Sequence, residues 1–520
     1  MRSFLQRHAT DVIGTLSGFD RVRVRGTLRL LASVGGMGYF MNRIGVKLKD
    51  FRSLVSRATD QIKTVTQRIA KRASRPIEYL PSCHTNKESV ALDIARRDGV
   101  KDGLIGVLSC VEGCRSFEVH RDRAKKLLDL RSVPRRCMHY YFYFLDPQLG
   151  FMHARLQTWF PFTLHICFNG REWLARQMDR ARLGYVRRDN CFVDVADVAK
   201  AQKLFDRQLS TDWPALFDRI ASRVHPSKAL LLGDCPVDYY WSVDQSEWAT
   251  DVMLRSPERL ASLYPRLLRH AVEHFGSREV LRFLARKVPA ERGVGRFQGA
   301  VETDLRQRPE GIRIKHRVNG NSLKMYDKQG SVLRVETTIN DPRDMKTFRP
   351  KEGDEHGEKA WRYLRKGVAD MHRRAEISQR ANERYLESLC AVDEKKPLGE
   401  LAESVCRPTH WRNQPVRALN PLSPDDARLL AAVNRAEFLL HGFRNRDLRD
   451  LLHPTATTDP AELRRRSAQV TRRLRMLRAH GLIQKVPHTH RYTISPQGQI
   501  TITAILAARA ANTANLTQAA

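Results

Sequence analysis

Apolar and polar residues alternate along several stretches of the chain, and a two-residue period predicts half-buried β-strands. In residues 18–31, Val22 and Val24 alternate with arginines, which predicts a strand with a basic face made by Arg21, Arg23 and Arg25. Residues 104–119 hold two β-rich runs around the turn-forming pair Glu112-Gly113. Residues 137–170 are aromatic and β-branched with interspersed prolines, which predicts an antiparallel meander.

The clearest alternation lies in residues 311–340, where two glycine-containing turns, at Asn319-Gly320 and Gln329-Gly330, separate three predicted strands. One face of this meander is apolar: Ile312, Ile314, Val318, Leu323, Met325, Leu333, Val335 and Ile339. The other face is polar and mostly basic: Arg313, Lys315, Arg317, Lys324, Tyr326, Lys328, Arg334, Glu336 and Thr338.

Helical periods and caps fill much of the remaining chain, with helices predicted near residues 46–74, 171–182, 195–224, 257–286 and 357–392. We therefore expect an α+β multidomain fold with central antiparallel sheets, helices and a separate C-terminal domain. The expected divisions are 1–135, a basic α/β region; 136–286, an α+β domain with the aromatic meander; 287–395, a basic antiparallel sheet plus helix; 396–422, a linker; 423–511, a DNA-binding domain; and 512–520, a tail.

Residues 423–511 carry a helical pattern with strong start signals. Ser423-Pro424 and Asp459-Pro460 each place a capping residue before a proline at the first helical position. The helix after Asp459 has an apolar stripe of Leu463, Val470, Leu474 and Leu477. With the hairpin pattern that follows Gly481, this order resembles the winged helices of bacterial transcription regulators and replication initiators. The resemblance implies DNA binding by Arg464, Arg465, Arg466, Gln469, Arg472, Arg473, Arg475, Arg478, His490 and Arg491.

Charge strengthens the expectation of a polyanionic partner. The chain has 91 Lys+Arg against 57 Asp+Glu, a formal net charge of +34 in 520 residues. DNA is the first expectation and RNA an alternative, and a homodimer is compatible with either. No apolar run is long enough to span a membrane and the first residues do not resemble a signal peptide, so we expect a cytoplasmic protein without a membrane partner. The nine cysteines are expected to be reduced.

The meander at 311–340 carries a second resemblance. Residues 322–328 (SLKMYDK) followed by 333–336 (LRVE) resemble the YDK…RxE strand pair of plasmid and phage rolling-circle replication initiators. The resemblance implies Tyr326 as a phenolic nucleophile, and Glu336 with Asp327, placed at the turn, as acidic residues beside a bound Mg2+ or Mn2+. The basic residues that would hold nucleic acid on this sheet are Arg313, Lys315, Arg317, Lys324, Lys328 and Arg334. The His-hydrophobic-His metal motif of such proteins is absent from the sequence.

Other residues offer further hypotheses. Asp20 could begin a metal-binding strand or act as a turn residue. Cys110, Cys114, Cys137 and His139 could bind zinc or be buried core groups. His488 and His490 could bind a metal or contact phosphate. The aromatic block 140–162 could stack bases, with Arg155, Gln157 and Trp159 on one face, or form core. Asp189, Asn190, Asp238, Asp244 and Asp251 have no spacing that defines a shared site.

The sequence thus predicts a DNA-binding and DNA-processing protein of a mobile or plasmid-like element, similar to a replication initiator or transposase, with metal-dependent nicking. A non-enzymatic winged-helix regulator is the alternative, and an RNA-binding protein is a further one. No P-loop, dinucleotide-binding glycine motif or nucleophile elbow occurs in the sequence.

Overall fold

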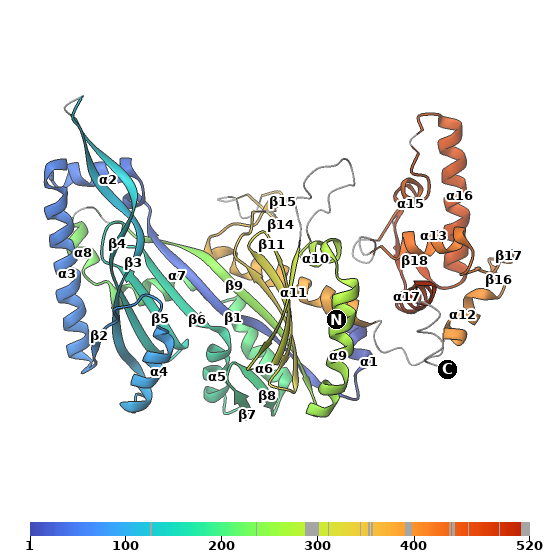
Figure 1. The fold of residues 1–520 in the computed structure, drawn as a ribbon, viewed down its shortest axis with the longest axis horizontal. Helices are drawn as coiled ribbons and strands as arrows, with labels where there is room; N and C mark the ends of the chain where they lie inside the picture. Colours follow the sequence, from blue (N-terminus) through green and yellow to red (C-terminus); the bar gives the residue numbers. More distant parts are fainter. Residues whose placement is uncertain are drawn as a thin grey trace. The chain divides into compact units, whose positions relative to one another are not determined.

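The structure is a computed structural model of the whole chain. It describes residues 1–520 except 125–126, 234, 236, 286–300, 310, 344, 352–353, 355–356, 391–397, 436–437, 439–441, 456, 488 and 511–520. The chain forms two compact units (Figure 1). The first comprises Met1–Val12, Ala261–Glu302 and Arg380–Ala520, and the second comprises Ile13–Leu260 and Thr303–Gln379.

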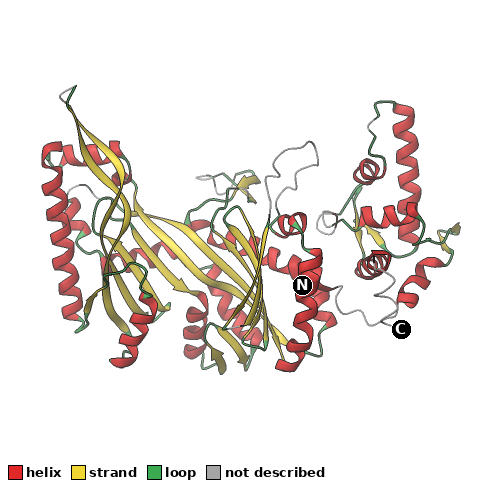
Figure 2. Ribbon diagram, in the orientation of Figure 1, coloured by secondary structure: helices red, strands yellow, loops and turns green. Residues whose placement is uncertain are grey.

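A large mixed sheet, whose strands are yellow in Figure 2, organises the second unit. It has 11 strands in the order β10-β11-β12-β13-β9-β1-β6-β5-β4-β3-β2. Its strands are β1 (Val12–Leu28), β2 (Ile77–Tyr79), β3 (Gly103–Asp122), β4 (Leu127–Asp146), β5 (Gly150–Gln157), β6 (Leu164–Asn169), β9 (Tyr239–Leu254), β10 (Glu302–Arg308), β11 (Gly311–Val318), β12 (Asn321–Lys328) and β13 (Val332–Ile339). The β2–β3 pair is parallel, whereas β1–β6, β9–β13 and the successive pairs from β3 to β6 and from β11 to β13 are antiparallel.

Apolar and polar residues alternate along the strands, which gives the sheet apolar faces, and helices cover these faces. The helices and short strands of this unit are α2 (Val34–Arg43), α3 (Phe51–Arg72), α4 (Lys87–Arg97), α5 (Gly170–Arg180), β7 (Tyr185–Arg188), β8 (Cys191–Val195), α6 (Val198–Asp206), α7 (Trp213–Val224), α8 (Lys228–Leu232), β14 (Lys346–Arg349), β15 (Ala360–Tyr363) and the start of α11 (Met371–Ser388).

The main core lies between one face of the sheet and helices α2, α3, α5, α6 and α7. Val22 and Val24 of β1 are fully buried there with Phe40 of α2, while Phe168 of β6 stacks on Trp213 of α7. Helix α4 covers part of the opposite face, in a smaller cluster. Arg21, Arg23 and Arg25 remain exposed, so the predicted basic strand face is confirmed.

The turns of the 311–340 meander follow the prediction. Asn319 and Gly320 have φ of 46° and 78°, and Gln329 and Gly330 have φ of 54° and 72°. Positive φ at both central positions suits a tight hairpin between antiparallel strands. The register pairs Val318 with Asn321 directly across the first turn.

The first unit holds α1 (Arg2–Arg7), α9 (Pro257–His274) from Ala261 onward, α10 (Ser277–Phe283), the end of α11 and the C-terminal elements. These are α12 (Leu398–Cys406), β16 (Thr409–Trp411), β17 (Gln414–Val416), α13 (Pro424–Val433), α15 (Asn445–Leu452), α16 (Pro460–Ala479), β18 (Ile483–Lys485), β19 (Tyr492–Ile494) and α17 (Pro496–Ala510). The side chains of Ser423 and Asp459 accept hydrogen bonds from the first-turn N–H groups of α13 and α16, as their sequence context predicts. Val470, Leu474 and Leu477 of α16 are buried against the other helices.

The arrangement differs from the sequence prediction in several respects. Strands from the regions expected as three domains, 1–135, 136–286 and 287–395, belong to one sheet rather than to separate sheets. Residues 396–422, expected as a linker, contain α12 and the β16–β17 hairpin, because Val405 and Leu419 are apolar enough to join the C-terminal core. The predicted tail 512–520 lies outside the described residues.

Candidate metal and nucleic-acid site

Three carboxylates meet where three neighbouring strands cross the middle of the sheet. Asp20 comes from β1, Glu247 from β9 and Glu336 from β13, and the oxygens they offer lie within 4.8 Å of one another. Glu336 pairs in register with Ala249, which places Glu247 two residues along on the same strand face. Hard oxygen donors of this kind suit Mg2+ or Mn2+. The cluster meets the distance requirement for a divalent cation.

Lys324 supplies positive charge to this cluster. Its Nζ donates to Glu336 Oε1 and lies 3.3 Å from Glu247 Oε1. Burial lowers the pKa of Lys324, but the charges of Glu336 and Glu247 outweigh burial and raise it overall. Burial, and next the charge of Glu336, raise the pKa of Glu247 to about 7, even with Lys324 beside it. The carboxylates of the cluster are therefore incompletely neutralised by their own lysine.

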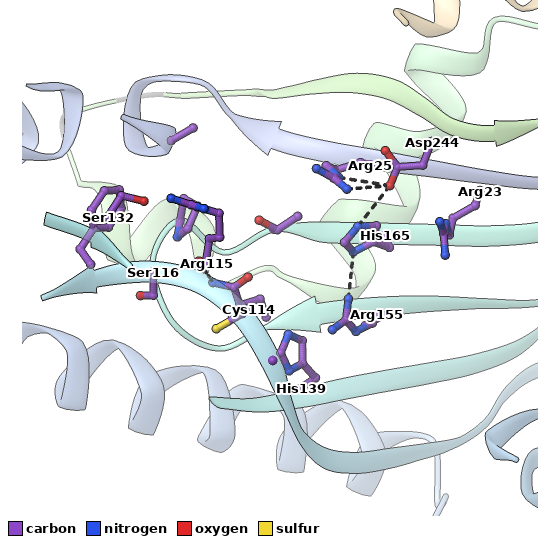
Figure 3. A pocket seen from close by; sticks show the side chains of 16 residues that line it. Arg23, Arg25, Cys114, Arg115, Ser116, Ser132, His139, Arg155, His165 and Asp244 are labelled. Atoms are coloured by element: carbon purple, nitrogen blue, oxygen red, sulfur yellow. Dashed lines mark hydrogen bonds and ion pairs between the residues drawn. The ribbon is translucent and has the colours of Figure 1, made fainter. Parts of the chain in front are cut away.

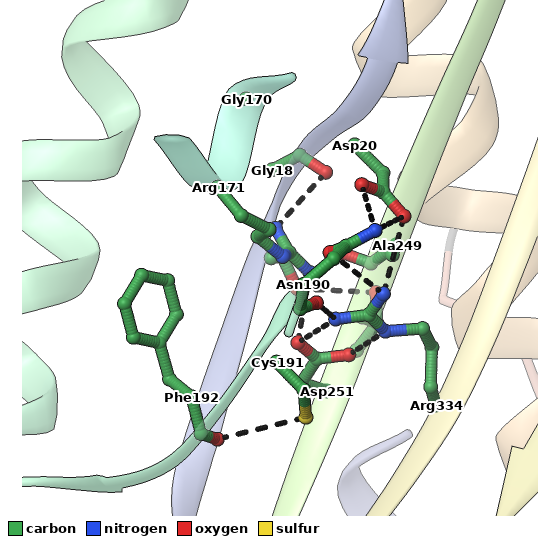
Figure 4. Close-up of polar contacts among 12 residues, drawn as sticks. Gly18, Asp20, Gly170, Arg171, Asn190, Cys191, Phe192, Ala249, Asp251 and Arg334 are labelled. Atoms are coloured by element: carbon green, nitrogen blue, oxygen red, sulfur yellow. Dashed lines mark hydrogen bonds and ion pairs between the residues drawn. The ribbon is translucent and has the colours of Figure 1, made fainter. Parts of the chain in front are cut away.

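A buried ionic network adjoins the cluster and fixes Asp20 (Figure 4). Arg334 of β13 binds Asp251 of β9 through Nε at 2.6 Å and Nη2 at 2.9 Å, and its Nη1 donates to Asp20 Oδ2 at 3.1 Å. Arg171 from the first turn of α5 donates to the same Asp251 at 2.9 Å. Burial raises the pKa of Asp251, but the two guanidinium groups overcome that effect and lower it overall. The guanidinium groups thus hold Asp251 as a carboxylate.

Two asparagines complete the orientation of Asp20. The side-chain amides of Asn190 and Asn169 donate to Asp20 Oδ1 at 2.8 and 2.9 Å. Asn190 also accepts from Arg334 through its backbone oxygen, at 2.8 Å. The Asp20 carboxylate is therefore held from β6, from the β7–β8 turn and from β13.

The predicted catalytic residues of β12 and β13 do not all come together. Tyr326 lies near Glu336, and burial together with that carboxylate raises the pKa of its phenol to about 12. A phenol with so high a pKa is a poor nucleophile at neutral pH. Asp327, expected at the turn, lies within β12 instead and points away from Glu336, because adjacent residues of a strand face opposite sides.

The predicted basic face of the meander is largely covered. Arg334, Lys324 and Lys328 are at most 6% exposed, and Arg334 is committed to Asp20 and Asp251. These three side chains cannot form the open phosphate clamp that strand alternation alone suggested. On β11, Arg313 is buried beside Asp304, whereas Lys315 is half-buried and Arg317 is exposed. Burial and neighbouring cations lower the pKa of Lys315 to about 8.

The C-terminal arginines are more accessible. Arg464, Arg465, Arg472 and Arg475 of α16 are exposed, and so is His490. Half-buried side chains are Arg466, Gln469, Arg473, Arg478 and Arg491. Glu462 binds Arg465 and Arg466, and Arg478 lies over the ring of Trp411. Arg464 and Arg472 have no ion pair within the described part of the chain.

The proposed zinc ligands do not form a metal site. The acidic cluster is the one metal-compatible group found among the described residues. Cys114 and Cys137 lie with their sulfurs 3.5 Å apart, and the ring of His139 bonds to the backbone oxygen of Cys137 at 3.1 Å. All nine cysteines are free thiols. Of the wing histidines, His488 lies outside the described residues.

The aromatic block is mainly core. Tyr140, Phe142, Phe144, Phe160 and Phe162 are buried. Gln157 is buried and donates to backbone oxygens, while Arg155 and Trp159 are half-buried. The block therefore offers few rings for stacking on bases.

Residues 243–254 carry no strand prediction, so Glu247 and Asp251 were missed as members of a site. Their spacing of four, which places both on one strand face, is the signal that could have found them. The other carboxylates without an assigned site lie apart from one another, each beside a different basic residue. Asp189 lies 3.5 Å from Lys328, Asp238 binds Lys228, and Asp244 binds Arg25.

Comparison with known proteins returned no protein family, no curated protein and no solved structure that matches the chain. Among the described residues, no helix has the length and apolar character needed to cross a bilayer. The fold and the site geometry are therefore the basis on which function is inferred.

Proposed function

We propose that this protein binds DNA through a winged-helix-like domain at residues 423–511. The observation that carries this proposal is α16, a 20-residue helix packed on one side by Val470, Leu474 and Leu477 with exposed arginines elsewhere. It follows α13 and α15 and precedes the β18–β19 hairpin, the order in which such domains place a recognition helix and a wing. The net charge of +34 supports a polyanionic partner.

Arg464 and Arg472 provide the sharpest test of DNA binding. Replacing both with Ala should lower the slope of log K against log salt by up to about 1.8, since each lost phosphate contact contributes about 0.9. The measurement is fluorescence anisotropy of a labelled duplex across a salt series. Arg407→Ala, at a 74% exposed arginine outside α16, is the matched control. Equal slopes for the double variant and the control would contradict the proposal.

A second proposal is metal-dependent cleavage of a DNA strand, as in replication initiators or transposases of mobile elements. The specific observation that favours it is the Asp20–Glu247–Glu336 cluster. A divalent cation held there would act as a Lewis acid on a phosphoryl oxygen. Asp20 is already oriented by Asn169, Asn190 and Arg334, and Lys324 would compete with the cation for Glu247 and Glu336.

Cleavage can be tested with supercoiled and single-stranded DNA in Mg2+ or Mn2+. Nicking should be lost in Glu247→Gln and retained in Glu88→Gln, which changes an exposed carboxylate on α4. If DNA stays intact over a range of sequences, the protein is better explained as a non-enzymatic regulator. Competition between duplex DNA and structured RNA in the anisotropy assay distinguishes these two DNA-binding functions from RNA binding. An RNA-binding protein would prefer the structured RNA.

A further inference from the structure

A basic cavity of about 520 Å³ lies on the sheet face opposite the main core (Figure 3). Its walls come from β1, β3, β4, β5, β6 and β9, together with Ala32 after β1 and with Pro161 and Thr163 before β6. All of these elements belong to the second unit. A volume of this size lies within the usual range for sites of small ligands.

Positive charge predominates in the cavity. Four arginines, Arg23, Arg25, Arg115 and Arg155, line it with a single carboxylate, Asp244. Asp244 is shared by Arg25 at 3.0 Å and His165 at 3.5 Å.

The remaining cations are incompletely neutralised. Arg155 lies 2.9 Å from Glu112 Oε2, but Glu112 also binds Lys87 at 3.0 Å and accepts from Tyr141 at 2.7 Å. Arg23 and Arg115 have no ion pair within the part of the chain that the structure describes. Two guanidinium groups are therefore left without a protein anion.

Arg155, His165 and Asp244 form a chain of polar contacts along one side of the cavity. Arg155 Nη1 lies 3.4 Å from His165 Nδ1, while His165 Nε2 faces Asp244. Burial lowers the pKa of His165 despite its bond to Asp244, so at neutral pH this ring is uncharged. A neutral ring can accept from Arg155 at Nδ1 and donate to Asp244 at Nε2. Arg155 Nε is buried and has no hydrogen-bond partner, which leaves a donor unsatisfied.

We propose that this cavity binds a phosphomonoester, with Arg23, Arg115 and Arg155 as its cationic ligands. A phosphomonoester carries close to two negative charges at neutral pH, which match the two guanidinium groups that lack a protein anion. Arginine forks bind phosphate oxygens in a bidentate manner. The same chemistry is presented by a free nucleoside monophosphate and by the 5′-phosphorylated end of a strand.

Calorimetric titration of the full-length protein tests the proposal with AMP, inorganic phosphate and an eight-nucleotide oligo-dT carrying either a 5′-phosphate or a 5′-hydroxyl. Arg23→Ala/Arg115→Ala should weaken binding of the phosphorylated probes at least tenfold. Both residues are exposed, so the fold should tolerate the change. Arg68→Ala, at an exposed position of α3, should bind as the wild type does.

Alkylation of Cys114, which lines the cavity, locates the ligand. Bound phosphomonoester should slow modification of Cys114 while leaving the exposed Cys83 unchanged, as followed by peptide mass spectrometry. Preference for AMP identifies a free nucleotide as the ligand, and preference for the 5′-phosphorylated strand identifies a strand end.

Equal affinity for phosphorylated and hydroxyl ends with no binding of AMP or phosphate would overturn the proposal, as would unaltered binding by the double variant. The proposal is independent of the two functions proposed above. Arg464→Ala/Arg472→Ala and Glu247→Gln should both retain binding in the cavity.

Discussion

Arg334 neutralises two buried carboxylates at once, Asp20 and Asp251. Replacing it with Met should destabilise the second unit by about 3–5 kcal/mol, since removal of one partner leaves buried charge uncompensated. The measurement is the urea-unfolding midpoint followed by tryptophan fluorescence. Arg317→Met on β11 of the same sheet, where the side chain is 46% exposed, should change stability by no more than about 0.5 kcal/mol. Similar midpoints for the two variants would show that the network contributes little.

Glu247 should make stability depend on pH. Its pKa rises from 4.5 to about 7 on folding, so the folded state binds the proton more tightly than the unfolded state. Stability from this residue is present in full below about pH 4.5 and is lost as pH rises to about 7, by at most about 3 kcal/mol. Glu247→Gln should remove this part of the pH profile. Identical profiles for wild type and variant, in urea unfolding between pH 4.5 and 8, would contradict the assignment.

The same residue links pH to metal binding. At pH 8 the carboxylate is ionised, so Mn2+ should raise the unfolding midpoint of the wild type but not of Glu247→Gln. Lys324→Met should increase the shift, because the ammonium group that competes for Glu247 and Glu336 is gone. If Mn2+ shifts the unfolding midpoint by the same amount in the wild type and both variants, the ion binds outside the Asp20–Glu247–Glu336 cluster.

At the scale of single residues, the sequence identifies candidate site residues better than it predicts which other residues they contact. Glu336 and Asp20 were both singled out, yet only the order of strands in the sheet brings them together across more than 300 positions. Arg334 was expected on an open face because alternation specifies a side of a strand and not what covers that side. Asn190, which accepts a hydrogen bond from Arg334, and Arg171, which binds Asp251 together with Arg334, come from a turn and a helix whose sequences carry no sign of these contacts.

At the scale of helices, strands and turns, the sequence predicted a feature correctly wherever that feature depends on residues close together in the chain. The caps at Ser423 and Asp459, the stripe of α16 and the turn at Asn319-Gly320 all depend on residues within a few positions of each other. The prediction of a linker at residues 396–422 was wrong because its apolar residues find partners farther along the chain, in α16 and α17. Strand β9 was not predicted, since burial on both of its faces hides the alternation after Gln245.

Gly311 at the start of β11 allows a test at this scale. Its φ is +137°, and a Cβ atom there would lie 1.6 Å from the backbone oxygen of Asp327. Gly311→Ala should therefore separate β11 from β12 and cost clearly more than Gly330→Ala, where φ is also positive but the surrounding space is open. The second change should cost about 1–2 kcal/mol from backbone conformation alone. Equal costs by urea unfolding would contradict the steric argument.

At the scale of the whole molecule, charge and composition indicate the class of partner but not the architecture. A mixed α/β fold follows from the alternation of strand and helix patterns, whereas one continuous sheet of 11 strands does not. Local patterns cannot specify which strands are neighbours. The pairing of β13 with β9 joins segments separated by α9 and α10, which belong to the other unit.

Because the chain forms two compact units, we expect a destabilising core substitution in one unit to leave the stability of the other unchanged. Leu477→Ala opens a cavity in the fully buried C-terminal core and should cost about 2–5 kcal/mol there. Hydrogen exchange should accelerate in α13, α15 and α16 while strands β1, β9 and β13 keep their protection. Faster exchange throughout the sheet would mean that the two units unfold together.

The Asp20–Arg171–Asp251–Arg334 network also has a consequence for synthesis on the ribosome. Its members emerge in that order, so a nascent chain that has reached α9 already holds Asp20 and Asp251 but lacks the guanidinium that joins them. Until β12 and β13 appear, the centre of the sheet carries the carboxylates of Asp20, Glu247 and Asp251, and Arg171 is the one arginine of the network that has been made. We expect the growing chain to keep that centre hydrated and open to chaperones until about residue 340 has left the exit tunnel, so that the last strands added close the sheet.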